Sequence, residues 1–257
     1  MLDTAEVYGP GRSERIIGRT LAAIPGEDRA GLTVATKFMP IAPAERIVAW
    51  EAAGSLRRLR ADVLDLYYAH QRNPFVSPRR VMQSLRPLVG EGLVRRVGVS
   101  NHSLAHWQEA ERALGTPVIA NQVRFSLADP APLRDLVPYA ADNDRLVVAY
   151  SPLAQGLLAV DRDWGTVKGF RRTMRPARRT VGFEPLATAV REIAAAHDAA
   201  PTQVALAWVL AHPNTIAIPG ARTVEQLESN AAAADLVLSN DEVARLTTAA
   251  ETFAAGR

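Results

Sequence analysis

Short apolar runs rich in β-branched residues alternate along the chain with longer segments of helical periodicity. Runs of the first kind predict buried strands, and apolar positions three or four residues apart predict amphipathic helices. The predicted strands run from Leu32 to Phe38, Leu64 to His70, Val94 to Ser100, Val118 to Val123, Leu146 to Tyr150 and Thr215 to Pro219. The predicted helices lie at residues 13–24, 44–59, 77–91, 103–114, 132–142, 185–196, 201–212 and 224–234, and a last helix is opened by Ser239.

Alternation of strand and helix is typical of βα units around a parallel sheet. The length of 257 residues suits one (β/α)8 barrel, and no repeat or linker divides the chain. We therefore expect an α/β fold, a (β/α)8 barrel, with a single domain over residues 1–257. Residues 154–184 lack a clear period and hold many Gly, Arg and Pro residues, which predicts a long loop and a candidate lid. We expect Trp164, Phe170 and Phe183 to pack there rather than line a pocket.

Composition excludes several functional classes. The chain has no cysteine, so it has no thiolate nucleophile, disulfide or Cys-ligated metal, and its formal net charge of +3 indicates no nucleic-acid partner. Its first residues do not resemble a signal peptide, and no apolar stretch is long enough to span a membrane. We expect a cytoplasmic protein without a membrane partner. His102 and His106 stand four residues apart without a third ligand, so we interpret them as part of a surface helix and expect no metal.

Polar residues close several of the predicted strands. In a parallel β/α barrel the reactive groups collect at the carboxyl ends of the strands. Each residue alone fits a cap or a strand terminus, but their recurrence in order indicates a site. The strand-end residues are Lys37, His70, Ser100 with Asn101, Asn121 with Gln122, and Tyr150 with Ser151.

Asp3 and Tyr8, together with Lys37 and His70, make an acid/base set without a pair of nucleophile and base. A free tyrosine titrates near pH ~10, so a nearby positive charge would help it to release a proton. Lys37 could supply that charge, Asp3 could hold the lysine, and His70 could orient a carbonyl oxygen. The four residues therefore indicate protonation of an oxyanion that forms when another group attacks a carbonyl carbon.

In order and spacing, these motifs resemble the aldo-keto reductase superfamily over nearly the whole chain. The resemblance implies that Tyr8 is the general acid, that Lys37 and Asp3 lower its pKa, and that His70 positions the substrate carbonyl. The motifs that carry it are Asp3 to Gly9 with Gly11, Ser13 and Glu14, then Ala35 to Phe38, Tyr68 to His70, Gly98 to Asn101, Asn121 with Gln122, Tyr150 to Leu153 with Gly156, and Ile218 to Arg222.

The resemblance also implies NADP(H) as the cofactor and a small carbonyl compound as the substrate. The nicotinamide ring would stack on Tyr150, and Ser100, Asn101 and Gln122 would bind its carboxamide. Arg222, near a helix start, suits the 2′-phosphate of NADP. Ser229 departs from the acidic residue or Gln that many members carry before Asn230. The remaining cofactor-binding residues would be Ser151, Pro152, Leu153, Gln155, Gly156, Pro219, Gly220, Gln226 and Asn230.

Members of the superfamily place a first β/α unit and most of a second strand before the segment that corresponds to Asp3–Tyr8. We expect the barrel to lack these elements, because the start is set too far downstream or the chain is a fragment. Two other interpretations stay open. One is a nicotinamide-binding regulatory subunit similar to the β subunits of potassium channels, and the other is an inactive truncated barrel. Nothing in the sequence marks a partner surface, and the resemblance favours a monomer.

Overall fold

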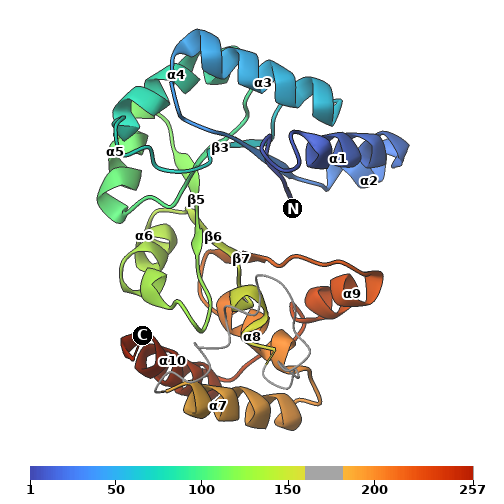
Figure 1. Cartoon of the computed structure of the whole chain (residues 1–257), viewed down its shortest axis with the longest axis vertical. Helices are drawn as coiled ribbons and strands as arrows, with labels where there is room; N and C mark the ends of the chain where they lie inside the picture. Colours follow the sequence, from blue (N-terminus) through green and yellow to red (C-terminus); the bar gives the residue numbers. More distant parts are fainter. Residues whose placement is uncertain (160–181, 257) are drawn as a thin grey trace. The chain divides into compact units, whose positions relative to one another are not determined.

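The computed structural model describes residues 1–159 and 182–256 (Figure 1). Internal contacts divide the chain into two compact units, Met1–Gln122 and Val123–Arg257, and each is described by itself. The predicted loop falls mostly between the described ranges, so Trp164 and Phe170 lie outside them. Phe183 is described, and its buried ring packs edge-on against Phe253 with the ring centroids 5.8 Å apart, as predicted for packing.

The first unit alternates strands and helices, as the periodicity predicted. Its strands are parallel and follow one another in chain order, and the helices pack side by side in the order α1, α3, α4 and α5 (Figure 1). The strands are β1 (Leu2–Asp3), β2 (Val34–Phe38), β3 (Leu66–Ala69), β4 (Val97–Ser100) and β5 (Val118–Arg124). The helices are α1 (Arg12–Ala23), α2 (Gly26–Ala30), α3 (Glu45–Leu59), α4 (Pro78–Gly90) and α5 (Leu104–Leu114).

Local chemistry explains where these elements begin. Ser77 and Ser103 precede α4 and α5, and each side chain accepts a hydrogen bond from a backbone N–H of the first helical turn. On α4, Val81, Leu85 and Leu88 are buried three or four residues apart, which gives the helix its apolar face. Capping and periodicity together account for the agreement between predicted and observed helices.

Two elements escaped prediction because they are short. Helix α2 spans five residues and none of its residues is buried, so it has no apolar period that a sequence pattern could reveal. Strand β1 has two residues and is defined by its pairing with β2. Leu2 lies opposite Val34, and Asp3 lies opposite Ala35. Asp3 therefore enters the sheet beside the strand that carries Lys37.

The second unit continues the alternation. Its strands β6 (Leu146–Tyr150) and β7 (Thr215–Ile218) are parallel neighbours, α6 packs on β6, α8 packs on β7, and α7 packs against α8 and α10. The unit also has two short 3₁₀ turns, η1 (Ala131–Arg134) and η2 (Ala154–Gly156). The helices are α6 (Leu136–Asp142), α7 (Phe183–Ala196), α8 (Pro201–Leu210), α9 (Val224–Ala232) and α10 (Asn240–Ala255). Among the described residues, none of the helices combines the length and the apolar character that a membrane span requires.

The interpretation of His102 and His106 as a surface helix pair is wrong for His102. His102 precedes α5 and is buried, with its Nδ1 3.0 Å from the carbonyl oxygen of Ser100. The side chain of Asn121 accepts from the backbone N–H of His102 and donates to its carbonyl at 2.8 Å. Their spacing of four suggested one helical face, but the helix starts only after Ser103.

Candidate active site

A buried ion pair joins the ends of β1 and β2. The Nζ of Lys37 lies 2.5 Å from Oδ1 of Asp3 and donates to the carbonyl of Thr4 at 2.7 Å. The side chain of Lys37 is fully buried and that of Asp3 is 10% exposed. The amide of Gln122 donates to the second oxygen of Asp3 at 2.8 Å. The carboxylate is thus held from both sides, and the ammonium group has two oxygen partners.

Tyr8 and His70 lie around this ion pair. The Nζ of Lys37 is 5.0 Å from the centroid of the Tyr8 ring, and the rings of Tyr8 and His70 meet edge-on with their centroids 5.6 Å apart. Tyr8 is 41% exposed, so its ring is open to solvent while the ammonium group beneath it is buried. The first unit therefore brings together all four residues of the predicted acid/base set.

The pKa of the Tyr8 phenol is shifted in the direction opposite to the one the sequence suggested. Burial raises the pKa of Tyr8, and the carboxylate of Asp3 raises it further. Burial also lowers the pKa of Lys37, although Asp3 opposes that shift. The carboxylate of Asp3, which pairs with the ammonium group at 2.5 Å, thus disfavours the ionised form of the phenol. The phenol therefore keeps its proton at neutral pH.

The imidazole of His70 is neutral at neutral pH. Burial lowers the pKa of His70 to about 4, the positive charge of Lys37 contributes to the shift, and Asp3 opposes it. The Nδ1 atom of His70 is buried and has no hydrogen-bond partner among the described residues. A neutral imidazole can donate from one nitrogen and accept at the other, which suits a group that orients a polar ligand.

The residues of this unit that were predicted to bind the nicotinamide carboxamide also lie together. Strands β4 and β5 place Ser100 opposite Gln122, and the hydroxyl of Ser100 donates to the carbonyl of Gln122 at 2.9 Å. The side chain of Asn101 donates to the hydroxyl of Ser100 at 3.2 Å, and its backbone adopts a left-handed φ of 57°. Sequence reasoning assigned Gln122 to the cofactor and missed its bond to Asp3, for which the sequence carries no local signal.

In the second unit, most of the predicted cofactor-binding residues line one pocket of about 550 Å³. Tyr150 and Arg222 are the predicted residues of this unit that do not line it. The backbone N–H of Arg222 donates to the Gln226 side chain at 2.9 Å, and Thr223 caps α9. The pocket is lined by Ser151, Pro152, Leu153, Gln155, Gly156, Ala159, Thr202, Ile218, Pro219, Gly220, Glu225, Gln226, Ser229 and Asn230.

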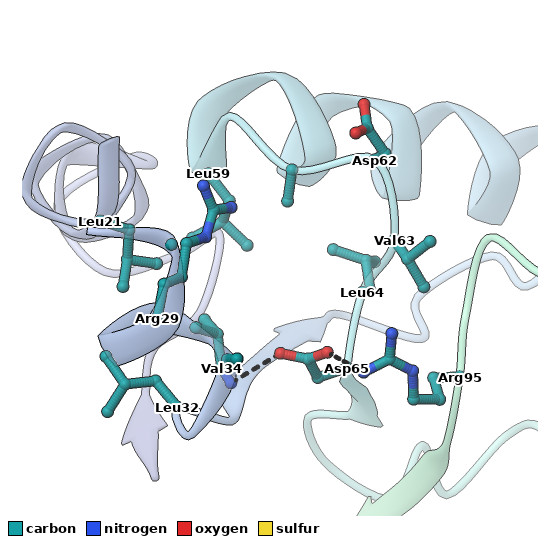
Figure 2. A pocket seen from close by; sticks show the side chains of 13 residues that line it. Leu21, Arg29, Leu32, Val34, Leu59, Asp62, Val63, Leu64, Asp65 and Arg95 are labelled. Carbon is teal, nitrogen blue, oxygen red and sulfur yellow. Dashed lines mark hydrogen bonds and ion pairs between the residues drawn. The ribbon is translucent and has the colours of Figure 1, made fainter. Parts of the chain in front are cut away.

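A different pocket, of about 380 Å³, lies at the other end of the first unit (Figure 2). In it Asp65 accepts from the backbone N–H of Val34 at 3.1 Å and from Arg95 at 2.8 Å. Val34 begins β2 and Asp65 precedes β3, whereas Lys37 and His70 stand where these strands end. This pocket is therefore separate from the acid/base residues. Within residues 1–159 and 182–256, His, Asp and Glu side chains form no group of three or more that could hold a metal ion.

This arrangement at the carboxyl ends of parallel strands places the protein in a known class. The chain belongs to the aldo/keto reductase family, whose model matches residues 1–251. The family comprises oxidoreductases that act on small carbonyl compounds. Its match, together with the similarity to a solved member, confirms the predicted α/β fold of the (β/α)8 type.

Three similar proteins illustrate the relationship. "Uncharacterized oxidoreductase Rv2298" of Mycobacterium tuberculosis is 46% identical over 256 residues, which cover 98% of this chain and 78% of that protein. "Methylglyoxal reductase YeaE" of Escherichia coli is 33% identical over 256 residues, covering 96% of this chain and 78% of that protein. An aldo/keto reductase from Klebsiella pneumoniae, solved with NADP and acetate, has 31% identity and a TM-score of 0.73, and the match covers 96% of this chain and 78% of that one.

Proposed function

We propose that this chain is an NADPH-dependent reductase of aldehydes or ketones in which Tyr8 protonates the carbonyl oxygen. The observation that carries the proposal is the exposed ring of Tyr8, 5.0 Å from a buried ammonium group and edge-on to a neutral imidazole. A general acid needs these features, because it must hold a proton, meet the substrate and leave behind an anion that its surroundings tolerate.

The residues present fit a nicotinamide dinucleotide. In the first unit, the hydroxyl and amide groups of Ser100, Asn101 and Gln122 would bind the carboxamide. In the second unit, the pocket from Ser151 to Gly156 and from Pro219 to Asn230 would take the phosphates and the adenosine, and Tyr150 would stack on the nicotinamide. A guanidinium is well matched to a phosphate, so Arg222 favours NADP over NAD. When bound, NADPH supplies a hydride to the carbonyl carbon.

The side chains of the first unit would then complete the reduction. His70 orients the carbonyl oxygen toward the phenol by a hydrogen bond from its neutral ring. As negative charge develops on that oxygen, Tyr8 donates its proton, because an alkoxide is a stronger base than a phenolate. Lys37 stabilises the phenolate that remains, and Asp3 keeps the ammonium group in place. The raised pKa of Tyr8 thus keeps the phenol protonated until the oxyanion forms.

We further propose that the protein acts as a single-domain monomer in the cytoplasm. The absence of cysteine suits a reducing compartment. Methylglyoxal and an aromatic aldehyde are reasonable first substrates, because one similar protein is named a methylglyoxal reductase and the Tyr8 ring offers an apolar contact.

The test compares the wild-type protein with Tyr8→Phe. We expect NADPH oxidation by wild type, a loss of about 10²-fold or more in kcat for the variant, as for removal of a general acid, and NADPH affinity that changes less than about twofold. NADPH affinity is read from fluorescence quenching. Equal activity of the variant would refute the role of Tyr8. Quenching without turnover in wild type would favour the regulatory subunit, and neither signal would favour an inactive barrel.

A further inference from the structure

The first turn of α1 contacts the segments that carry the acid/base residues. Ser13 and Glu14 lie in this turn, and they belong to a motif to which the proposed reaction assigns no role. The hydroxyl of Thr4 donates to the hydroxyl of Ser13 at 2.7 Å, and the hydroxyl of Thr36 donates to the carboxylate of Glu14 at 2.7 Å. Both threonines are fully buried. These bonds attach α1 to the ends of β1 and β2.

The two threonines are next to Asp3 and Lys37 in the chain. Successive side chains of a strand point to opposite faces, so Thr36 points toward α1 where Lys37 points toward the acid/base residues. The carbonyl of Thr4 also accepts from the Nζ of Lys37 at 2.7 Å. A shift of either threonine would therefore move a partner of the ion pair.

The same turn also holds the backbone of Tyr8. The N–H of Ser13 donates to the carbonyl of Tyr8 at 3.3 Å, and the N–H of Gly11 donates to the carbonyl of Glu6 at 2.6 Å. The segment from Glu6 to Gly11 is thereby closed into a tight loop on the start of α1. Tyr8 and Lys37 thus share one anchor, although 29 positions separate them in the sequence.

Glu14 is itself fixed by charge and packing. It is fully buried, and its second oxygen accepts from Nε of Arg58 at 2.5 Å. Arg58 also donates to Ser55 at 3.2 Å. A Cβ on Gly18 would come within 2.4 Å of the carbonyl oxygen of Arg58, so α1 can approach α3 only because glycine stands there. The anchor is therefore rigid on the side away from the active site.

We propose that Ser13 and Glu14 are positioning residues, which hold Thr4 and Thr36 so that the Lys37–Asp3 pair and the Tyr8 ring keep their reactive arrangement. The proposal rests on the proposed function. A hydrogen bond to a charged, buried carboxylate is both strong and directional, which suits a role in alignment. Misalignment of reacting groups by as little as ~1 Å can cost about 10²-fold in rate.

The experiment uses Thr4→Val and Thr36→Val, singly and together, in the full chain. Valine keeps the shape and removes only the hydroxyl donors, so the variants should fold, and circular dichroism melting checks this. Thr36→Ser restores the donor and serves as the rescue. Ser84→Ala is the matched control, because Ser84 is a buried serine whose hydroxyl donates to Val81 within α4, apart from the site.

We expect kcat to fall about tenfold or more in the double variant, while the Kd for NADPH changes less than about twofold and Thr36→Ser recovers most of the rate. A second readout needs no turnover. The imidazole proton resonances of His70 can be assigned by their loss in His70→Gln. Their chemical shifts depend on the Tyr8 ring, which meets the imidazole edge-on with the centroids 5.6 Å apart. They should move in the valine variants and stay in Ser84→Ala.

The outcomes separate this proposal from the proposed function. Slower reduction with displaced His70 resonances supports positioning. Unchanged kcat and unchanged resonances in the valine variants overturn it, even if the melting temperature drops. If wild type shows no turnover, the proposed function fails, and the His70 resonances alone decide whether Ser13 and Glu14 fix the cluster.

Discussion

Gly98 in β4 offers a direct test of the packing beside the candidate active site. A Cβ at this position would lie 2.4 Å from Cε1 and 2.5 Å from Cδ1 of the Tyr68 ring. Tyr68 is fully buried in β3, directly opposite Gly98 in the parallel register, so its ring has little room to retreat. The Nζ of Lys37 lies 6.0 Å from the centroid of the same ring. We predict that Gly98→Ala destabilises the protein through this contact.

The magnitude follows from overpacking. Alanine is intrinsically better than glycine in a strand, so the backbone contribution favours the variant slightly. Forcing an extra carbon into a well-packed core costs about 1–3 kcal/mol, and real Cβ atoms are essentially never found closer than 3.0 Å to such neighbours. For a protein of this size, ~1 kcal/mol corresponds to about 2–4 °C. We therefore expect the melting temperature to fall by about 2–12 °C.

The assay is thermal unfolding followed by circular dichroism, with urea unfolding for the free energy. Gly90→Ala is the matched control, because Gly90 ends α4 and a Cβ there meets no atom within 4 Å. That variant should equal or exceed wild type in stability. In the Tyr68→Ala background the ring is gone, so Gly98→Ala should cost little, and a double-mutant cycle measures the coupling.

Two results would contradict this prediction. A melting temperature of Gly98→Ala equal to that of wild type would mean that the Tyr68 ring is free to move. Equal costs of Gly98→Ala with and without the Tyr68 ring would mean that the cost comes from another contact. Neither result depends on the proposed reaction, because both are measured on the protein without cofactor or substrate.

Two further predictions concern pH. Burial and the neighbouring Glu6 raise the pKa of Glu51 to about 7, so the folded protein binds the extra proton between pH 4.5 and about 7 and loses stability as the pH rises through that window. Glu51→Gln should therefore melt higher than wild type at pH 8 and equally at pH 4.5, and an equal difference at both pH values would exclude this cause. Because the pKa of Tyr8 is raised above its usual value of 10.0, the proposed reduction should keep its kcat from about pH 6 to 9 and decline only at higher pH. A loss of kcat between pH 6 and 8 would point to another proton donor.

The sequence determined the order of the elements and predicted which residues the candidate site would bring together. A strand such as β3 is buried at every position, and a helix such as α4 has a regular apolar face. Both elements can therefore be predicted from the local pattern of apolar residues. Lys37 and His70 could be found because a polar residue that closes an apolar strand stands out. Gly98 carried no such signal, because the Tyr68 ring, which leaves no room for a side chain at this position, belongs to another strand.

The tertiary structure decided how these residues act on one another. Gln122 donates to Asp3 across 119 positions, and Ser13 holds Thr4 through a bond between two hydroxyl groups. The sequence suggested that Lys37 lowers the pKa of Tyr8, whereas burial and Asp3 raise it. Desolvation and pairing depend on which groups the fold places around a side chain, and those neighbours are distant in the chain. Local patterns in the sequence indicate candidate residues, but the charge state of each residue depends on the groups that the fold places around it.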